Sequence, residues 1–242
     1  MIFLLFCCSG LTLIAQPLNY SLKKDYLKFQ LENLQFSDDS LYSSGVEYVN
    51  GKLYNVSGNS YSNPYYDDNS WKSGEVWYFG LKYYIPMLKY DLNKDILIQL
   101  LNSNTSSYTV SFKKEFVKEF TISGHHFKYL DDFQQSYQNK LKHGYFELVY
   151  NGRVQFYVRR EELRNSHNEI FNQGYTHWTY CFLKKDGKYL RIIGNSSLVA
   201  ALKDHKKELR SFIRQNNIRI KVESYDQISA LLDYYDKLTR ND

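Results

Sequence analysis

The sequence is poor in cysteine: three stand in 242 residues, and Cys7 and Cys8 are two of them. Residues 2–15 carry no charge, and polar sequence follows from Gln16. A helix needs about 20 apolar residues to cross a bilayer, so this run is too short to span one. It is typical of a secretory signal peptide cleaved before Gln16, although no Lys or Arg precedes Lys23. The alternatives are a buried N-terminal element and a lipid anchor at Cys7 or Cys8.

Removal of that signal leaves Cys181 as the single cysteine, and one thiol cannot form an internal disulfide. The mature chain is therefore not a disulfide scaffold and has to be held together by its core. Its length, about 227 residues, is enough for that. The 24 Tyr and 15 Phe supply the bulk of such a core, and the tyrosine hydroxyls suit a partly wet surface.

The sequence also lacks the common catalytic and cofactor motifs. It contains no G-x-S-x-G, H-E-x-x-H, P-loop or G-x-G-x-x-G. The six His are scattered, and only His125 and His126 are adjacent; neighbours on a strand point to opposite faces, which argues against a metal site there. His177 and Cys181 lie about 13 Å apart along a strand, too far for a catalytic dyad. We expect no catalytic residue, no metal and no cofactor.

Charge is unevenly distributed along the chain. Residues 1–183 hold 18 basic and 18 acidic side chains, whereas residues 184–242 hold 13 and 8, which is the whole excess of five. The sequence therefore describes a neutral aromatic body followed by a basic tail region.

The densest aromatic and β-branched run lies between Trp71 and Leu101. Such residues suit a pleated, half-buried surface, so this run, punctuated by Gly74, Gly80 and Asn93–Lys94, predicts three consecutive strands. We expect Asp91 to brace the turn before the third strand, which is a structural role.

Three dipeptides predict tight hairpins: Asn50–Gly51, Asn151–Gly152 and Asp186–Gly187. Each accepts positive φ at both central positions of a two-residue turn. Their expected strands are Val46–Val49 with Lys52–Val56, Phe146–Tyr150 with Arg153–Val158, and Tyr180–Lys184 with Lys188–Ile192. Tyr108–Phe112 and Phe116–Ile122 are further expected strands. Three such turns indicate an antiparallel β protein.

Several segments carry weaker signals. Residues 123–144 and 160–174 are polar and irregular, and we expect the second to run outside the sheet. Within residues 27–36 the apolar side chains fit both a strand and a helix, and the two stay open.

Beyond Ile193 the apolar period changes to that of helices. Asn195 or Ser196 can cap a first helix that ends at Asn216–Asn217. Its apolar side includes His205, which we interpret as a core histidine. A second helix begins at Ser224. The apolar side of the second helix consists of Ile228, Leu231, Leu232, Tyr235 and Leu238.

These patterns predict a mainly β (α+β) protein: an antiparallel meander or incomplete barrel of hairpins, with two C-terminal amphipathic helices packed on it. The expected divisions are a signal peptide (1–15), an N-terminal segment (16–44), the β body (45–193) and the helical pair (194–242).

Two surfaces are candidate binding sites. The loop before the first strand of the aromatic run gathers aromatic rings and carboxylates that suit sugar rings or peptides, although an ordinary turn has the same composition. Its residues are Tyr65, Tyr66, Asp67, Asp68 and Trp71. The polar side of the first helix is basic and suits anionic lipid, anionic glycan or a partner, with a solvated helix face as the alternative. Its residues are Lys203, Lys206, Lys207, Arg210 and Arg214.

Four segments carry a resemblance to a known group of proteins. They are W71-x-x-G74-x-V76-x-x-x-G80-x-x-Y83, L88-K-Y90-D91-x-x-x-D95-x-L97-I98, L209-R-S-F-I213-R-Q-N216 and L231-L-D-Y-Y235. Over residues 45–238 the chain resembles uncharacterised exported β-rich proteins of Bacteroidota. The resemblance implies an envelope location and a β-rich body, and it carries over no catalytic residue.

The sequence thus favours an exported, non-enzymatic binding or accessory protein of the bacterial cell envelope. An envelope protein or glycan is the expected partner, and nucleic acid is not expected. Two alternatives stay open: a hydrolase that uses Asp67 or Asp68 with a second carboxylate, and a small β-barrel of the outer membrane.

Overall fold

The computed structural model describes residues 52–54, 63–102, 107–133, 143–165, 174–220 and 224–240, all within the compact unit formed by residues 50–242. The expected signal peptide, the N-terminal segment with residues 27–36, and the strand and turn expected over 46–51 lie outside these residues. In the described part of the chain, no helix is long and apolar enough to cross a membrane.

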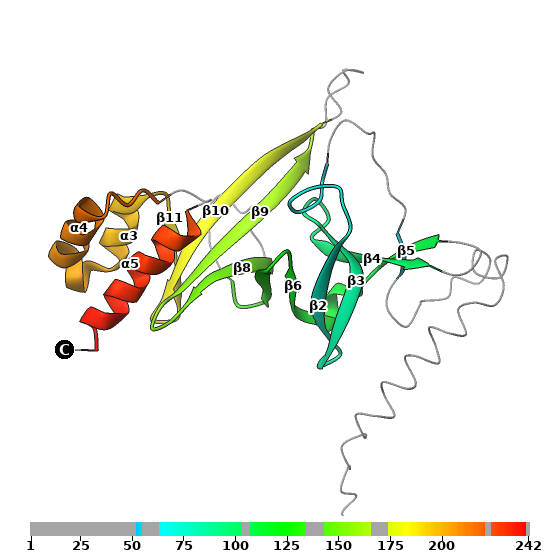
Figure 1. The fold of residues 1–242 in the computed structure, drawn as a ribbon, viewed down its shortest axis with the longest axis horizontal. Coiled ribbons are helices and arrows are strands. Elements are labelled where there is room, and N and C mark those ends of the chain that lie inside the picture. The colour runs from blue at the N-terminus through cyan, green and yellow to red at the C-terminus, as the bar shows by residue number, and fades with distance from the viewer. Residues whose placement is uncertain are drawn as a thin grey trace, which may run out of the picture. The chain divides into compact units, whose positions relative to one another are not determined.

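The fold is mainly β, as the sequence predicts. The described residues form one antiparallel sheet of eleven strands, followed by three α-helices where two were expected (Figure 1). The strands are β1 (Lys52–Leu53), β2 (Lys72–Tyr78), β3 (Leu81–Asp91), β4 (Ile96–Asn102), β5 (Ser107–Ser111), β6 (Val117–Ile122), β7 (His125–Leu130), β8 (Gly144–Asn151), β9 (Gln155–Arg164), β10 (Tyr175–Lys185) and β11 (Lys188–Ile192). The helices are α3 (Asn195–Ala201), α4 (Lys206–Gln215) and α5 (Tyr225–Leu238), with short 3-10 turns η1 (Lys114–Phe116) and η2 (Lys203–His205).

The sheet consists of two meanders joined side by side. Strands β2 to β5 follow one another in space, as do β6 to β11, and the two sets meet where β2 pairs with β6. The short β1 adds to β5. Among the described strands, β1 and β11 stand at opposite ends of the order, so the sheet stays open.

Tight turns with left-handed backbone connect three of the hairpins. Phe79–Gly80, Ser123–Gly124 and Asp186–Gly187 have φ between 51° and 78°, as a two-residue type I′ turn requires. The hairpin predicted at Asp186–Gly187 is confirmed, with Lys185 opposite Lys188. The turn predicted between Tyr78 and Leu81 from Gly80 is likewise present.

The tight turn expected at Asn151–Gly152 is wrong, although the hairpin exists. Asn151 pairs with Gln155, so the connection is the three residues between them, and Gly152 is not among the glycines with positive φ. A Cβ on Gly152 would lie 2.1 Å from Asp236 Oδ2. This glycine is therefore required by the close approach of α5 and not by turn geometry.

The two polar segments expected to be irregular contribute strands. Residues 125–130 form β7. Residues 160–164 belong to β9, so the expectation that 160–174 runs outside the sheet is wrong for them. The remainder of the two segments over 134–142 and 166–173 lies outside the described residues.

Polar side chains of β9 are paired across strands: Arg160 with Glu147, and Glu162 with His177. Pairs of this kind stabilise strands whose exposed face is polar. These strands therefore lack the alternation of apolar and polar residues from which a strand is predicted.

Aromatic residues fill a core to which β3 of the first meander and β6, β7 and β8 of the second contribute. Tyr90, Phe120, Phe127 and Tyr145 are almost fully buried, with ring centroids 4.8–5.9 Å apart. Most of these ring pairs meet edge to face, the geometry that the ring quadrupoles favour.

Aliphatic side chains fill the second core, between the helices and one face of β8 to β11. Its central residues are Val154, Phe156, Val158, Leu183, Leu198, Leu202, Leu209, Ile228, Leu231 and Leu232. The helices therefore pack on the sheet and on each other, as expected from their apolar sides (Figure 1).

The first predicted helix is divided. Leu202 has φ −104° and ψ 49°, and η2 separates α3 from α4. At the break Asp204 accepts hydrogen bonds from Lys185 Nζ at 2.8 Å and from the Tyr235 hydroxyl at 2.7 Å. These tertiary bonds favour the break over a continuous helix. His205 is half-buried beside the Tyr235 ring, at 5.8 Å between centroids.

Candidate functional site

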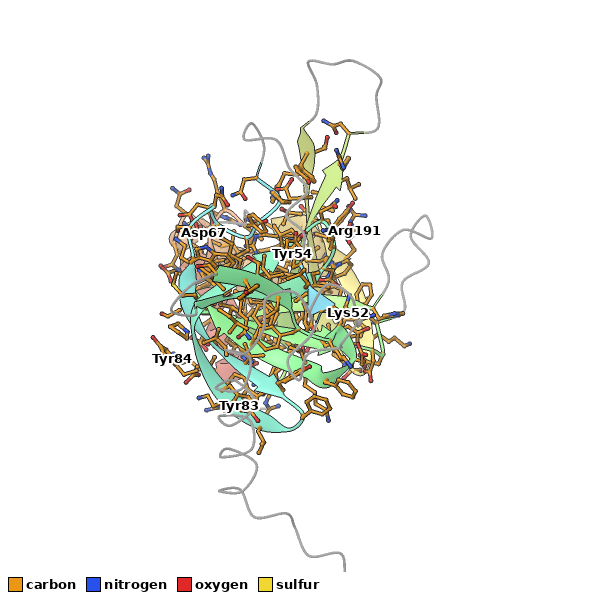
Figure 2. All side chains as sticks on the ribbon, turned by 90° about the vertical axis from the view of Figure 1, so that its right-hand side faces the viewer. Lys52, Tyr54, Asp67, Tyr83, Tyr84 and Arg191 are labelled. Carbon is orange, nitrogen blue, oxygen red and sulfur yellow. The ribbon has the colours of Figure 1, made fainter. Side chains whose placement is uncertain are left out.

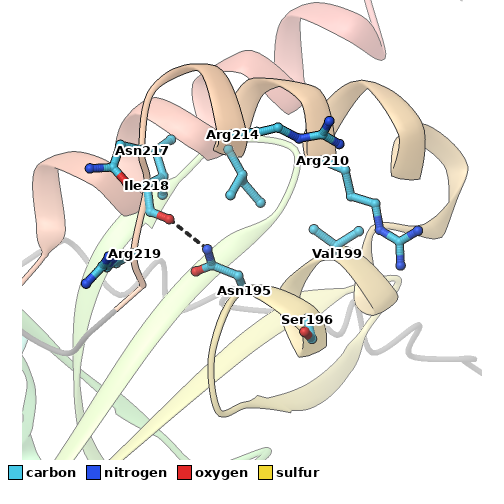
Figure 3. A pocket seen from close by; sticks show the side chains of 9 residues that line it. Asn195, Ser196, Val199, Arg210, Arg214, Asn217, Ile218 and Arg219 are labelled. Carbon is cyan, nitrogen blue, oxygen red and sulfur yellow. Dashed lines mark hydrogen bonds between the residues drawn. The ribbon is translucent and has the colours of Figure 1, made fainter.

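A cavity of about 490 Å³ opens between α3, α4 and the segment that follows α4 (Figure 3). Three arginine residues and three apolar residues belong to its lining. Its lining consists of Asn195, Ser196, Val199, Arg210, Ile213, Arg214, Asn217, Ile218 and Arg219. We call it the arginine cavity.

The ends of α4 explain how the three arginines come together. Arg210 and Arg214 lie one turn apart on α4 and are exposed, whereas Leu209 between them and the sheet is buried. Asn217 adopts φ 49°, which ends the helix and turns the chain. Arg219 thereby reaches the cavity from the far side.

Asn195 fixes the segment that carries Arg219. Its Nδ2 donates to the Ile218 carbonyl at 2.7 Å, and its Oδ1 accepts from the Ile220 N–H at 2.8 Å (Figure 3). Because one side-chain amide bonds both a backbone acceptor and a backbone donor of this segment, it fixes the segment against α3, which forms another wall of the cavity.

Electrostatically the arginine cavity is uncompensated. Within the described ranges, no carboxylate forms an ion pair with Arg210, Arg214 or Arg219. Two acids of the helical layer are paired elsewhere: Asp204 binds Lys185, and Asp236 accepts from Tyr150 and from the Arg153 N–H. Like charges one helical turn apart repel, so an anion between them would relieve a cost already built into the fold.

The basic surface predicted from sequence is divided between this cavity and the open helix surface. Arg210 and Arg214 line the cavity. Lys203, Lys206 and Lys207 are exposed and do not line it. Arg219 and Asn195 complete the cavity. The sequence indicated Asn195 only as a possible helix cap, a position that Gly194 occupies, and Arg219 lies beyond the helical period of the other residues.

The aromatic loop predicted as a binding surface is split into three environments. Tyr65 is buried, and the Lys89 ammonium lies 4.6 Å from its ring centroid and 4.4 Å from that of Trp71. Lys89 also donates to Asn69 at 2.9 Å. Burial lowers the pKa of Lys89, and the cation–π contacts with Tyr65 and Trp71 help to hold this lysine in place.

Tyr66 lies in a different cluster from its neighbour. It is buried edge-on against Phe127, with centroids 5.0 Å apart, and the Arg160 guanidinium lies 5.4 Å from its ring. Burial raises the pKa of Tyr66 well above its usual range, with the nearby Glu147 carboxylate adding to the effect.

Asp67 and Asp68 form the third environment, on the surface (Figure 2 labels Asp67). Their side chains are 52% and 54% exposed, and Lys72 Nζ lies 3.4 Å from Asp67 and 2.8 Å from Asp68. Hydrogen bonds from Lys72, and next from Ser70, lower the pKa of Asp68. This shift disfavours Asp68 as the general acid of a hydrolase, which needs a raised pKa, but not as the second, ionised carboxylate.

Two buried polar clusters escaped the sequence analysis. In the first, Asp95 accepts from the Tyr90 hydroxyl at 2.5 Å, from Arg159 at 2.8 Å and from Lys114. Arg159 also donates to the Tyr145 carbonyl at 2.8 Å. Burial alone would raise the pKa of Asp95, but the charges of Arg159 and Lys114 outweigh it and the pKa is lowered.

In the second cluster, Glu147 is 2% exposed and binds three partners. His125 Nδ1 lies 2.5 Å from its carboxylate, the Tyr225 hydroxyl donates to it at 2.8 Å, and Arg160 pairs with it. Tyr225 belongs to α5, so this cluster ties the last helix to β7, β8 and β9.

The histidines and the cysteine are dispersed. His125 contacts Glu147, whereas its neighbour His126 contacts Glu119. His177 is exposed beside Glu162, and Cys181 is buried in the helical core. No group of three potential metal ligands occurs in the portion of the chain that the structure describes.

Comparison with known protein families, curated proteins and solved structures finds no match for this chain. The function is therefore inferred from the geometry of the chain itself.

Proposed function

We propose that this protein is an exported, non-enzymatic binding or accessory protein of the bacterial cell envelope, and that its ligand is an oxyanion bound in the arginine cavity. The observation that carries the proposal is that Arg210, Arg214 and Arg219 all line one cavity, with no described carboxylate paired to them.

The chemistry of arginine supports an oxyanion. A guanidinium presents a planar fork of donors that matches the oxygens of a carboxylate, phosphate or sulfate, often through two parallel bonds. Two forks from α4 and a third from the opposite wall can surround one such group. Val199, Ile213 and Ile218 add apolar surface for the rest of the ligand.

The same chemistry favours binding over catalysis at this place. Arginine stays protonated in proteins and offers only donors, so the three guanidinium groups cannot exchange protons with a substrate near neutral pH. Ser196 and the amides of Asn195 and Asn217 add polar groups that do not titrate there either.

Calorimetric titration of the protein with inorganic pyrophosphate tests the binding site. We expect binding that weakens at least tenfold in the double variant Arg210→Gln/Arg214→Gln. The matched control is Lys206→Gln/Lys207→Gln, which removes the same charge from the same helix outside the cavity. Equal losses in both variants would show a general charge effect and would contradict the assignment of the cavity.

Fractionation of the native host, with mass spectrometry of the N-terminus, tests export. The expected result is a chain that begins at Gln16 and is found in the periplasm, in the medium or with the envelope. Retention of Met1 in the cytoplasm would contradict the envelope assignment without affecting the titration.

A further inference from the structure

Strand β10 is paired on both sides along only part of its length. β9 pairs with it from Tyr175 to Lys184, whereas β11 pairs only with Cys181–Lys185. Within the described ranges, no strand lies on the second side of residues 175–180. An unpaired strand edge presents a row of N–H and C=O groups to whatever can pair with it.

Other edges of this sheet carry the residues that usually prevent such pairing. β4 pairs with β3 only at Leu88–Asp91, which leaves residues 81–87 without a described partner on that side. That edge contains Lys82 and Pro86, both of which oppose strand addition. The end strand β11 carries Lys188 and Arg191, and β1 has two residues.

Residues 175–180 have none of these protections. The sequence Tyr-Thr-His-Trp-Thr-Tyr contains no Lys, Arg, Asp, Glu, Pro or Gly and is rich in residues that favour strands. An edge of this composition is expected to be covered by another strand.

Apolar side chains are exposed beside the same edge. Trp178 is 47% exposed, and its ring is parallel to that of Tyr180 within 9° at 6.4 Å. Leu163, opposite Thr176 on the neighbouring strand, is also 47% exposed. Ile193, which follows β11 directly, is 83% exposed. Such a group of apolar side chains is typical of an interaction surface.

We propose that this edge pairs with the same edge of a second copy of the chain, so that the two sheets continue into one across a twofold axis at Trp178. Antiparallel pairing about an axis normal to the sheet keeps opposed side chains on one face. Trp178 then faces its own copy, His177 faces Thr179, and Thr176 faces Tyr180.

The second copy is the occupant that the composition favours. No formal charge meets a like charge in this register, and each copy supplies one of the two tryptophans of a cross-strand aromatic pair. Ile193 of each copy follows the residue that pairs with Cys181 on the free side of β10, whereas Leu163 lies on β9, one strand back from the boundary. The paired segment is short, so we expect a weak, concentration-dependent dimer and not a permanent one.

Sedimentation velocity of the full chain over a hundredfold range of concentration tests the proposal. We expect the weight-average sedimentation coefficient to rise with concentration. Trp178→Lys should weaken dimerisation at least tenfold, because it places two lysines against each other. Tyr84→Lys is the control: Tyr84 is 68% exposed on the protected edge of β3 (Figure 2), and its replacement should leave dimerisation unchanged.

Disulfide trapping tests the register, in a background with Cys7→Ser and Cys8→Ser. Trp178→Cys should form a reducible dimer under mild oxidation, because two directly opposed residues have Cα atoms within disulfide range. Thr179→Cys should not, because its copies lie beyond about 7 Å in this register. A monomer at every concentration, a dimer that persists in Trp178→Lys, or equal trapping at both positions would overturn the proposal.

Discussion

Arginine has different roles in the sheet and in the helical layer of this molecule. In the sheet, Arg159 and Arg160 are largely buried, and each is paired with a buried carboxylate, Asp95 or Glu147. In the helical layer, Arg210 and Arg214 are exposed and have no described acidic partner. The first pair belongs to the fold, whereas the second pair is available to a ligand.

The two regions differ in how far they remove a charged side chain from water. A buried guanidinium is tolerable only with a partner, because the loss of hydration has to be offset. An exposed one keeps its hydration and stabilises the fold little. Removal of a partner should therefore damage the sheet, and removal of an arginine should hardly disturb the helical layer.

The largest effect is expected from Asp95→Ala. It removes the buried partner of Arg159, whose side chain is 6% exposed, and leaves only the more exposed Glu161, at 3.2 Å, to balance that charge. We expect the free energy of unfolding to fall by about 3–5 kcal/mol, measured by urea denaturation. Asp68→Ala, which breaks an exposed pair with Lys72, is the control and should change stability little. Similar losses in both variants would remove the distinction between buried and exposed pairs.

Acid should unfold the protein partly through the same carboxyl. The pKa of Asp95 is lower in the folded protein than its usual value of about 3.9. The stability it contributes is therefore complete above about pH 4 and is lost as the pH falls towards the folded pKa, by up to about 1.4 kcal/mol per pH unit. Urea denaturation between pH 5 and pH 2 should show a shallower loss in Asp95→Asn. A curve unchanged by that substitution would contradict the assignment.

A smaller effect is expected where α5 meets the sheet. Tyr225→Phe removes the hydroxyl that donates to Glu147 and should cost about 1 kcal/mol. Tyr234→Phe is the control on the same helix, because its ring stacks on Phe212 at 4.3 Å and the ring is kept. Equal unfolding midpoints for the two variants would show that the Glu147 cluster does not hold α5.

The smallest effect on stability is expected from Arg210→Gln/Arg214→Gln. These side chains are exposed and repel each other, so the free energy of unfolding should change by no more than about 0.5 kcal/mol. Thermal and urea unfolding of this variant measure the change. A loss of several kcal/mol would mean that the arginines are structural, and the comparison between the two regions would fail.

The antiparallel fold could be predicted from sequence because its signals are local. Asp186–Gly187 and Gly80 define turns by their own backbone preferences, and burial in the aromatic run from Trp71 to Leu101 alternates as in strands. The tight turn predicted at Asn151–Gly152 was wrong, because Gly152 leaves room for the carboxylate of Asp236, which lies 84 positions later in the chain.

The features that could not be predicted depend on contacts between residues far apart in the sequence. Asp95 and Arg159 are 64 positions apart, and no local pattern links them. Tyr65 and Tyr66 looked alike in sequence, yet they face different clusters. Two of the three arginines of the cavity could be predicted, because Arg210 and Arg214 follow the helical period. Arg219 could not be, because its position depends on the bonds of Asn195.

The most direct test follows the arginine Nε–Hε signals by NMR while inorganic pyrophosphate is added. The signals of Arg210, Arg214 and Arg219 should shift together in a saturable way. Those of Arg159 and Arg160, fixed by Asp95 and Glu147, should stay in place. Uniform small shifts of all exposed arginines, or no saturation, would contradict the arginine cavity as a binding site.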